Sequence, residues 1–139
     1  MNVSIDTLQN EIIEEFELFD DWMDKYEHIV EMGKNLPVIN TEMKTDEHLI
    51  DGCQSKVWLA ARLEDGKVHF TADSDAIITK GIVSLLIRVL SNHSPAEILN
   101  TDLYMIDRIG LATHLSPTRS NGLLSMINKM KSYAKAFIH

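Results

Sequence analysis

The chain has 139 residues, close to the usual size of one domain, so we expect residues 1–139 to form a single domain around one core. Its formal charge of −8 argues against a nucleic-acid-binding protein, because contacts with phosphate need clustered Lys and Arg. The charge is uneven, at −11 for residues 1–52 and +3 for residues 53–139. An acidic face can attract a basic partner, although the solvated sides of two helices are the simpler interpretation.

Two amphipathic helices are predicted before Pro37. Apolar residues recur at spacings of three and four through TLQNEIIEEFELF, with Ser4 or Asp6 available as the N-cap. The same spacing continues in DDWMDKYEHIVEMGKNLP, where Gly33 lies near the end and Pro37 prevents continuation. We expect these two helices to pack together as a hairpin.

Two β-strands joined by a tight turn are predicted next. From Val57 the apolar period changes to two, and the alternation resumes after the turn EDGK. Asp65-Gly66 is a typical two-residue hairpin turn. Because an isolated hairpin is only marginally stable in water, we expect a third strand from the segment around His48 to Asp51, and helices over the sheet.

The rest of the chain predicts helices. Residues 76–93 are apolar on nearly every side, so this helix should be central, and Gly81 within it indicates the close approach of another backbone. Ser94-Pro95 opens a short helix, YMIDRIGL forms another, and SPTRSNGLLSMINKMKSYAKAF forms a long amphipathic one. With strands clustered between helices, the order indicates an α+β fold, with a small antiparallel sheet of about three strands packed against helices.

Cys53, the only cysteine, is the first candidate for chemistry. A lone cysteine is most often a small buried hydrophobe. Its neighbours favour a loop instead, because Gly52 permits a tight turn and both Asp51 and Gln54 are poor core residues. One cysteine cannot form an internal disulfide, which is typical of a reducing compartment, and we expect a cytoplasmic protein without a membrane segment.

No metal site is predicted, since the six histidines are scattered without paired spacing, and no cysteine-protease signature surrounds Cys53. Arg119 and Asp75 are weaker candidates. Arg119 should lie near a helix start, where a cation is poorly matched to the helix dipole, so a specific partner or a site role gains some weight, although a solvated arginine is the simpler interpretation. Asp73-Ser74-Asp75 ends the hairpin before the central helix, and capping of that helix explains these residues.

Together these motifs closely resemble the SufE family of sulfur-acceptor proteins. The resemblance is carried by GCQSKVWLAARLEDGKVHFTADSDAIITKGIVSLL and HLSPTRSNGLLSMI, and KYEHIVEMGKNLP extends it upstream, so that it covers about residues 10–137. Four motifs occur in the same order and spacing: GCQS before a Val-Trp strand, DSDA at a helix start, KG inside the central helix, and SPTRSNG. Together they are far more specific than one short pattern. Lys56 stands where the family also commonly has glutamine, which is a mild variation.

The resemblance implies a role for Cys53. It would accept sulfane sulfur from a persulfide on a SufS-like cysteine desulfurase, a pyridoxal-phosphate enzyme, and pass it to iron–sulfur scaffold proteins. Arg119 would be a supporting cation and Asp75 a cap that couples the loop to the helix. The protein would be a carrier and activator rather than an enzyme, with no cofactor of its own and a fold shared with IscU-type scaffolds. Its oligomeric state is left open between monomer and homodimer.

Gly52, Gln54 and Ser55 would form the loop around the thiol. We expect the tip of this loop to fold back against the sheet and the central helix in the free protein, and to swing outward in the complex. Two alternatives stay open. A CsdE-type paralogue would serve another desulfurase and another thiolation pathway. A regulatory binding module would keep Cys53 as a structural residue and recognise its partner through the acidic helices.

Overall fold

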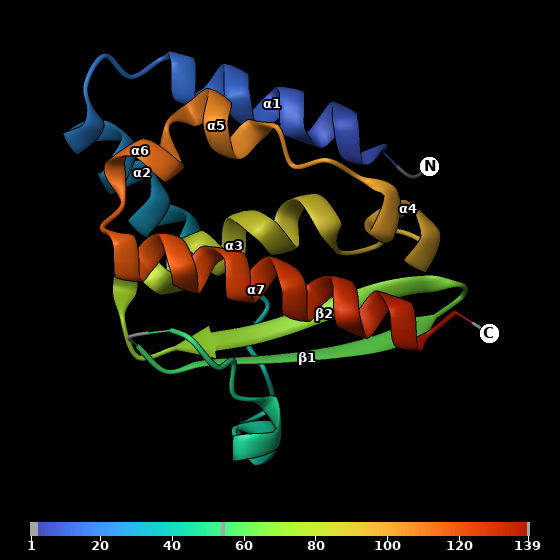
Figure 1. Cartoon of the computed structure of the whole chain (residues 1–139). Coiled ribbons are helices and arrows are strands. Elements are labelled where there is room, and N and C mark those ends of the chain that lie inside the picture. The colour runs from blue at the N-terminus through green and yellow to red at the C-terminus, as the bar shows by residue number, and fades with distance from the viewer. Residues whose placement is uncertain (1–2, 54, 139) are drawn as a thin grey trace.

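The computed structural model describes residues 3–53 and 55–138 (Figure 1). Two strands and several helices make up this part of the chain. The strands are β1 (Val57–Glu64) and β2 (Lys67–Ser74). The α-helices are α1 (Ile5–Glu17), α2 (Trp22–Met32), α3 (Ile77–Leu90), α4 (Pro95–Asn100), α5 (Met105–Ile109), α6 (Leu111–His114) and α7 (Pro117–Ala136). Short 3-10 helices are η1 (Gly33–Asn35), η2 (Thr41–Met43) and η3 (Asp46–His48).

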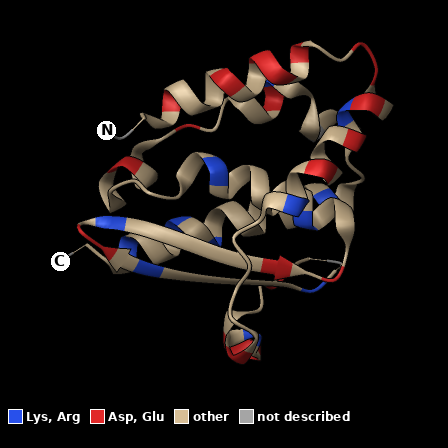
Figure 2. Cartoon of the chain, turned by 180° about the vertical axis from the view of Figure 1, so that it is seen from behind, with Lys and Arg blue, Asp and Glu red and all other residues tan. Residues whose placement is uncertain are grey.

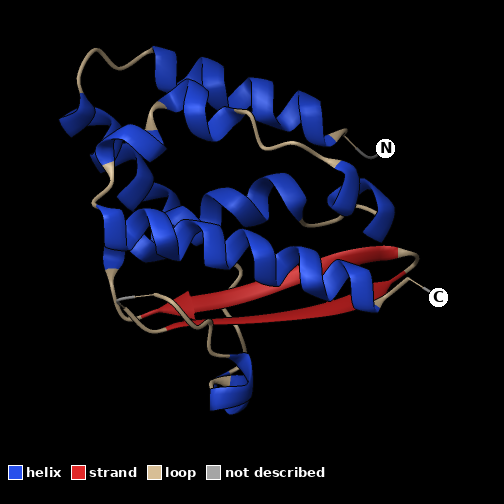
Figure 3. Cartoon of the chain, viewed as in Figure 1, coloured by secondary structure: helices blue, strands red, loops and turns tan. Residues whose placement is uncertain are grey.

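The elements are arranged in layers, which confirms the predicted α+β fold. The β1–β2 hairpin forms one layer, α3 and α7 lie over one of its faces, and α1 and α5 lie beyond α3 (Figures 1 and 3). The segment with η2 and η3 projects on the other side of the hairpin (Figure 3). Buried apolar side chains from both strands, α1, α3 and α7 form one core cluster. Within residues 3–53 and 55–138, none of the helices has the length and hydropathy that a membrane span requires.

The predicted hairpin turn is confirmed, whereas the prediction of a third strand is wrong. Asp65 and Gly66 have φ angles of 54° and 78°, and Glu64 pairs with Lys67 across the turn. In the described residues the sheet has two strands, and the segment expected to supply the third makes only one bridge to β1, from Leu49. This pairing stays short because η2 and η3 occupy the residues before it and a tight turn follows at Gly52.

The helix α3 is central, as predicted, and Gly81 explains how closely α2 approaches it. A Cβ atom on Gly81 would stand 2.1 Å from the carbonyl oxygen of Ile29 in α2, so no larger residue fits without displacement. This close fit draws α2 onto α3, whereas α1 packs on α5 and α3. The predicted α1–α2 hairpin is therefore wrong, although the two helices do meet where the Phe16 and His28 rings lie 5.0 Å apart.

Candidate functional site

Cys53 lies in the loop that leads into β1. The residue before it, Gly52, has a φ of +89°, which residues with a side chain rarely adopt. A Cβ atom on Gly52 would also stand 2.7 Å from the Oγ atom of Ser125 in α7. Glycine therefore serves both the turn of the loop and its close approach to α7.

The side chain of Cys53 rests on a second glycine, Gly122 of α7. The thiol donates to the Gly122 carbonyl oxygen across 3.7 Å, and a Cβ atom on Gly122 would stand 3.4 Å from the Sγ atom. Cys53 is half-buried and packs against the core. Burial raises the pKa of its thiol, because the thiolate loses hydration there. In this conformation the thiol is therefore protonated at neutral pH and a poor nucleophile.

A cavity of about 230 Å³ opens beside the thiol. The Cys53 loop forms one side of it, α3 forms a wall, and the first turns of α7 complete it. The lining residues are Cys53, Ser55, Thr79, Ile82, Thr118, Arg119, Gly122 and Met126. The cavity combines apolar side chains with hydroxyl groups and one guanidinium, so it suits a small group that carries negative charge.

Arg119 lies where the sequence predicts it, near the start of a helix. It is the third residue of α7, and its backbone N–H donates to the Oγ atom of Ser116, the N-cap, at 3.3 Å. Its side chain is exposed, lines the same cavity as Cys53 and makes no ion pair with any residue the structure describes. The pKa of Cys53 is raised by burial in this conformation.

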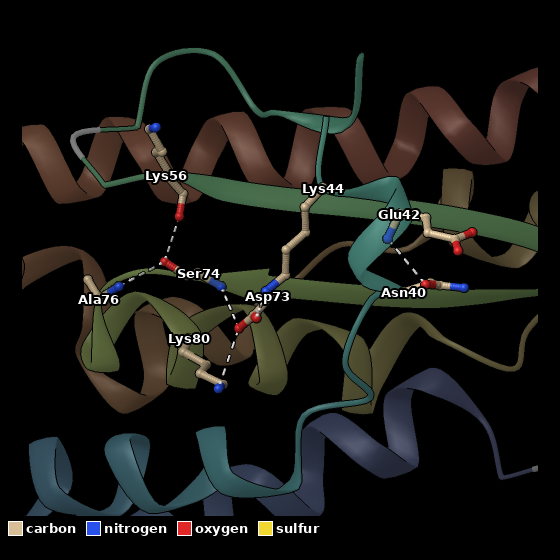
Figure 4. A network of polar contacts seen from close by, with 8 residues as sticks. All are labelled: Asn40, Glu42, Lys44, Lys56, Asp73, Ser74, Ala76 and Lys80. Atoms are coloured by element: carbon tan, nitrogen blue, oxygen red, sulfur yellow. Dashed lines mark hydrogen bonds and ion pairs between the residues drawn. The ribbon is translucent and has the colours of Figure 1, made fainter. Parts of the chain in front are cut away.

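Asp75 does not cap α3, which corrects the predicted capping role. The N-cap position is Ala76, and no side chain caps it. The Asp75 carboxylate instead accepts from the backbone N–H of Lys56 at 3.0 Å, and the Asp75 N–H donates to the Lys56 carbonyl at 3.2 Å. The Ser74 hydroxyl also donates to this carbonyl, at 2.8 Å, and accepts from the Ala76 N–H (Figure 4). Asp75 and Ser74 thus join the end of the Cys53 loop to the start of α3.

Asp73 anchors the segment on the other side of the loop. Its carboxylate lies 2.5 Å from the Lys44 ammonium and 3.4 Å from that of Lys80 (Figure 4). Lys44 also lies over the Trp58 ring, 5.5 Å from its centre. Burial opposes ionisation of Asp73, but hydrogen bonds from Lys44 and from the Ser74 N–H outweigh it and lower the pKa. Both arms of the Cys53 loop are therefore tied to the end of β2.

The cavity thus brings together Cys53, Ser55 and Arg119 from the predicted set, while Gly52 turns the chain beside it. Gln54 lies outside the described residues. Sequence reasoning missed Thr79 and Gly122. A glycine inside a predicted helix signals a close approach, and this signal, which identifies Gly81, would also have found Gly122. Thr79 gives no comparable signal, because a threonine in an apolar helix is common.

Many of the acidic side chains lie away from the cavity. They follow α1 and α2, whereas the cavity is lined by the Cys53 loop, α3 and α7 (Figure 2). Within the described residues, no three His, Cys, Asp or Glu side chains gather as metal ligands. The acidic surface and the thiol are therefore separate features of the molecule.

Comparisons with known proteins show which family this chain resembles. The SufE family model, described as an Fe-S metabolism associated domain, matches residues 10–134. An uncharacterized SufE-like protein of Rhizobium meliloti is 39% identical over 134 residues, which cover 93% of this chain and 96% of that protein. SufE-like protein 1, chloroplastic/mitochondrial, of Arabidopsis thaliana is 38% identical over 125 residues, which cover 89% of this chain and 34% of that protein.

A solved structure shares the fold. The solution structure of a hypothetical protein from Thermus thermophilus matches with a TM-score of 0.77 at 19% identity, over 93% of this chain and 94% of that one. At this identity the match supports the fold alone. The family model covers most of the chain, and the identity to the Rhizobium protein extends over nearly the full length of both sequences. The chain therefore belongs to the SufE family.

Proposed function

We propose that this protein is a sulfur acceptor. Cys53 takes the outer sulfur of a persulfide on a cysteine desulfurase, which it also stimulates, and the sulfur is relayed to iron–sulfur cluster assembly. The observation that carries the proposal is the setting of Cys53: a half-buried thiol, on a loop tied at both ends, beside a cavity with room for an added atom. Membership of the SufE family supports the same role.

The transfer needs no oxidant. The Cys53 thiolate attacks the outer sulfur of the desulfurase persulfide, a new S–S bond forms on the Sγ atom of Cys53, and the S–S bond on the desulfurase breaks. The desulfurase cysteine leaves as a thiolate. The outer sulfur keeps its proton as it is transferred to Cys53. The charge on both sides of the step is one negative charge, and sulfane sulfur keeps its oxidation level.

The loop must open for this step. In the conformation described, burial raises the pKa of the Cys53 thiol and α7 covers it, so attack is slow. A docked desulfurase would draw the loop off Gly122, where the thiol regains hydration and ionises. Arg119 would offset the thiolate charge during this motion; its exposed side chain, without an ion pair in the described part of the chain, supports this role. After transfer, closure returns the persulfide to the cavity.

The partners follow from the chemistry. We propose a pyridoxal-phosphate desulfurase of the SufS type as the sulfur donor and an iron–sulfur scaffold protein as the destination. The protein is then a carrier and activator and needs no cofactor. Its place is the cytoplasm, because a thiol that cycles through a persulfide must be protected from oxidation.

The test is intact-mass measurement after incubation with a cysteine desulfurase, pyridoxal phosphate and free cysteine. We expect the mass to rise by whole sulfur atoms, and a thiol reductant should reverse the gain. Cys53→Ser is the matched control and should gain none. No gain in the wild-type protein with several desulfurases would overturn the proposal.

The same reagents separate the alternatives. Full stimulation of the desulfurase by Cys53→Ser would favour a binding module in which the cysteine is structural. Loss of stimulation with Cys53→Ser, followed by pairwise assays against each desulfurase of the host, would distinguish a SufS partner from that of a CsdE-type paralogue.

A further inference from the structure

Thr79 of α3 is buried in the wall of the Cys53 cavity, with 8% of its surface exposed. Its side-chain hydroxyl makes no hydrogen bond to any residue in the described ranges. In that part of the chain, no side-chain nitrogen or oxygen is fully enclosed without a partner. The Thr79 hydroxyl therefore keeps some contact with solvent, and Thr79 is one of the residues that line the cavity. Because it has no protein partner in the described residues, this hydroxyl is available to donate to a group that enters the cavity.

The Cys53 thiol without added sulfur is not the group that this hydroxyl binds. The Sγ atom of Cys53 already faces the Gly122 carbonyl, to which it donates its proton. The guanidinium of Arg119 lines the same cavity without an ion pair in the described residues. A hydroxyl donor and a cation around one small cavity favour an anion, and a neutral thiol does not supply one.

A persulfide on Cys53 does supply one. Sulfur bonded to sulfur is more acidic than an ordinary thiol, so its outer atom is largely anionic at neutral pH. This atom extends one bond beyond Sγ, and the cavity of about 230 Å³ beside Sγ can accommodate it. An anionic sulfur accepts hydrogen bonds, which is what the Thr79 hydroxyl can donate.

We propose that Thr79 donates a hydrogen bond to the outer sulfur of the Cys53 persulfide, so that the cavity stabilises the persulfide form of the protein more than the thiol form. The inference rests on the proposed function and deepens it, since it names the group that retains the sulfur. Stabilisation of the loaded state draws sulfur from the desulfurase towards this chain. It also makes release depend on opening of the loop, which withdraws the sulfur from Thr79.

The experiment loads Cys53 without a desulfurase. An aromatic disulfide converts the thiol to a mixed disulfide and releases one aromatic thiol, and hydrosulfide then displaces the second aromatic thiolate to leave the Cys53 persulfide. Wild type, Thr79→Val, Thr79→Ser and Thr71→Val are compared. Thr71 lies in β2 and does not line the cavity, so Thr71→Val is the matched control. Two quantities are measured for each protein: the pH midpoint of the persulfide absorption, and the change in unfolding temperature on loading.

We expect Thr79→Val to raise the midpoint by about one pH unit, a tenfold loss in anion stability, because hydrogen bonds to charged groups are among the strongest. It should also lose most of the stabilisation on loading. Thr79→Ser, which keeps the hydroxyl, and Thr71→Val should behave as wild type. If Thr79 had a purely structural role, Thr79→Val would lower the unfolding temperature of the loaded and unloaded proteins equally. The pH midpoint and the change in unfolding temperature on loading would then match those of wild type.

Equal midpoints in wild type and Thr79→Val would overturn the inference, as would equal stabilisation on loading. These results are independent of the enzymatic test. If chemical loading shows the Thr79 effect but no desulfurase transfers sulfur, the proposed function fails and the anion cavity stands. If sulfur is transferred and Thr79→Val holds it as wild type does, the function stands and the role of Thr79 is wrong.

Discussion

Asp75 and Lys56 hold each other by two hydrogen bonds, from the Lys56 N–H to the Asp75 carboxylate at 3.0 Å and from the Asp75 N–H to the Lys56 carbonyl at 3.2 Å. Lys56 is three residues after Cys53, so this pair fixes the end of the thiol loop to the residues that precede α3. One bond uses a side chain and is open to mutation, whereas the other uses the backbone alone. The strength of the closed loop can therefore be reduced without removing any group that lines the cavity.

Asp75→Ala should loosen the loop. It removes one hydrogen bond acceptor, and we expect the free energy of unfolding to fall by about 0.5–1.5 kcal/mol. Alkylation of Cys53 by a neutral reagent should become severalfold faster in the folded protein, because the thiol is released from α7 more often. Asp20→Ala, which removes an exposed carboxylate between α1 and α2, is the control. An alkylation rate unchanged from wild type would show that this bond does not restrain the loop.

The two helical glycines should respond in opposite ways to alanine. Gly81→Ala places a Cβ atom 2.1 Å from the Ile29 carbonyl and should destabilise the protein by about 2 kcal/mol or more, as overpacking does. Gly122→Ala meets Cys53 Sγ at 3.4 Å, an ordinary contact, and should stabilise α7 by up to about 1 kcal/mol. Urea unfolding measures both. A Gly81→Ala protein as stable as wild type would mean that α3 and α2 are not in close contact.

The ionisation of Cys53 should depend on folding. Burial raises the pKa of its thiol, so the alkylation rate should reach half its maximum at a higher pH in folded protein than in urea. Between the unfolded and folded pKa values, the native state keeps a proton that the unfolded state has lost. The free energy of unfolding therefore falls as pH rises through this interval. Cys53→Ser should lack this alkaline decline, and identical profiles for the two proteins would refute the assignment.

Glu15 and Arg88 form a salt bridge between α1 and α3. The hydrogen bond from Arg88 lowers the pKa of Glu15. Its contribution to stability is complete above the unfolded pKa of the carboxyl group and is lost as pH falls through the lowered value. Glu15→Gln should cost about 1 kcal/mol or less at neutral pH, since both side chains are about one-third exposed, and should flatten the acid side of the stability profile. An unaltered acid profile would exclude this pair as a source of pH dependence.

Arg119→Ala tests the proposed cation. The side chain is exposed, so the unfolding temperature should change little, while the rate of sulfur uptake from the desulfurase should fall by about tenfold, the effect of losing one favourable charge interaction. Arg119→Lys should recover part of the rate. Arg108→Ala, another exposed arginine on α5, is the control. Normal uptake by Arg119→Ala would remove this residue from the mechanism.

Local patterns predicted most elements of the fold because each pattern has one physical interpretation. The Asp65-Gly66 turn sets the register of β1 and β2, and an apolar sequence on every side gives a buried α3. The third strand failed because consecutive 3-10 turns and the positive φ of Gly52 leave a segment too short to pair. Periodicity does not contain this information, since turns of this kind depend on what the loop packs against.

The candidate site was predictable only in part. The glycine before Cys53 and the strand after it place the thiol in a loop, but contact with Gly122 joins positions 69 residues apart. The sequence alone therefore pointed to the sheet and α3 as cover, whereas the thiol also contacts α7 at Gly122. Thr79 is a similar case, because only the packing of α3 against the loop distinguishes its hydroxyl from any other in a helix.

The Gly81 contact has a mechanical consequence. Gly81 lies between Thr79 and Ile82, the two α3 residues in the cavity wall, and its own position is set by the backbone of α2. Because the backbones of α3 and α2 are in close contact at Gly81, α3 has little room to shift towards α2. If a partner docks as proposed, we expect the Cys53 loop to move while α3 keeps its position. Under the proposed function, the cavity would open by movement of the loop alone, without rearrangement of the interior.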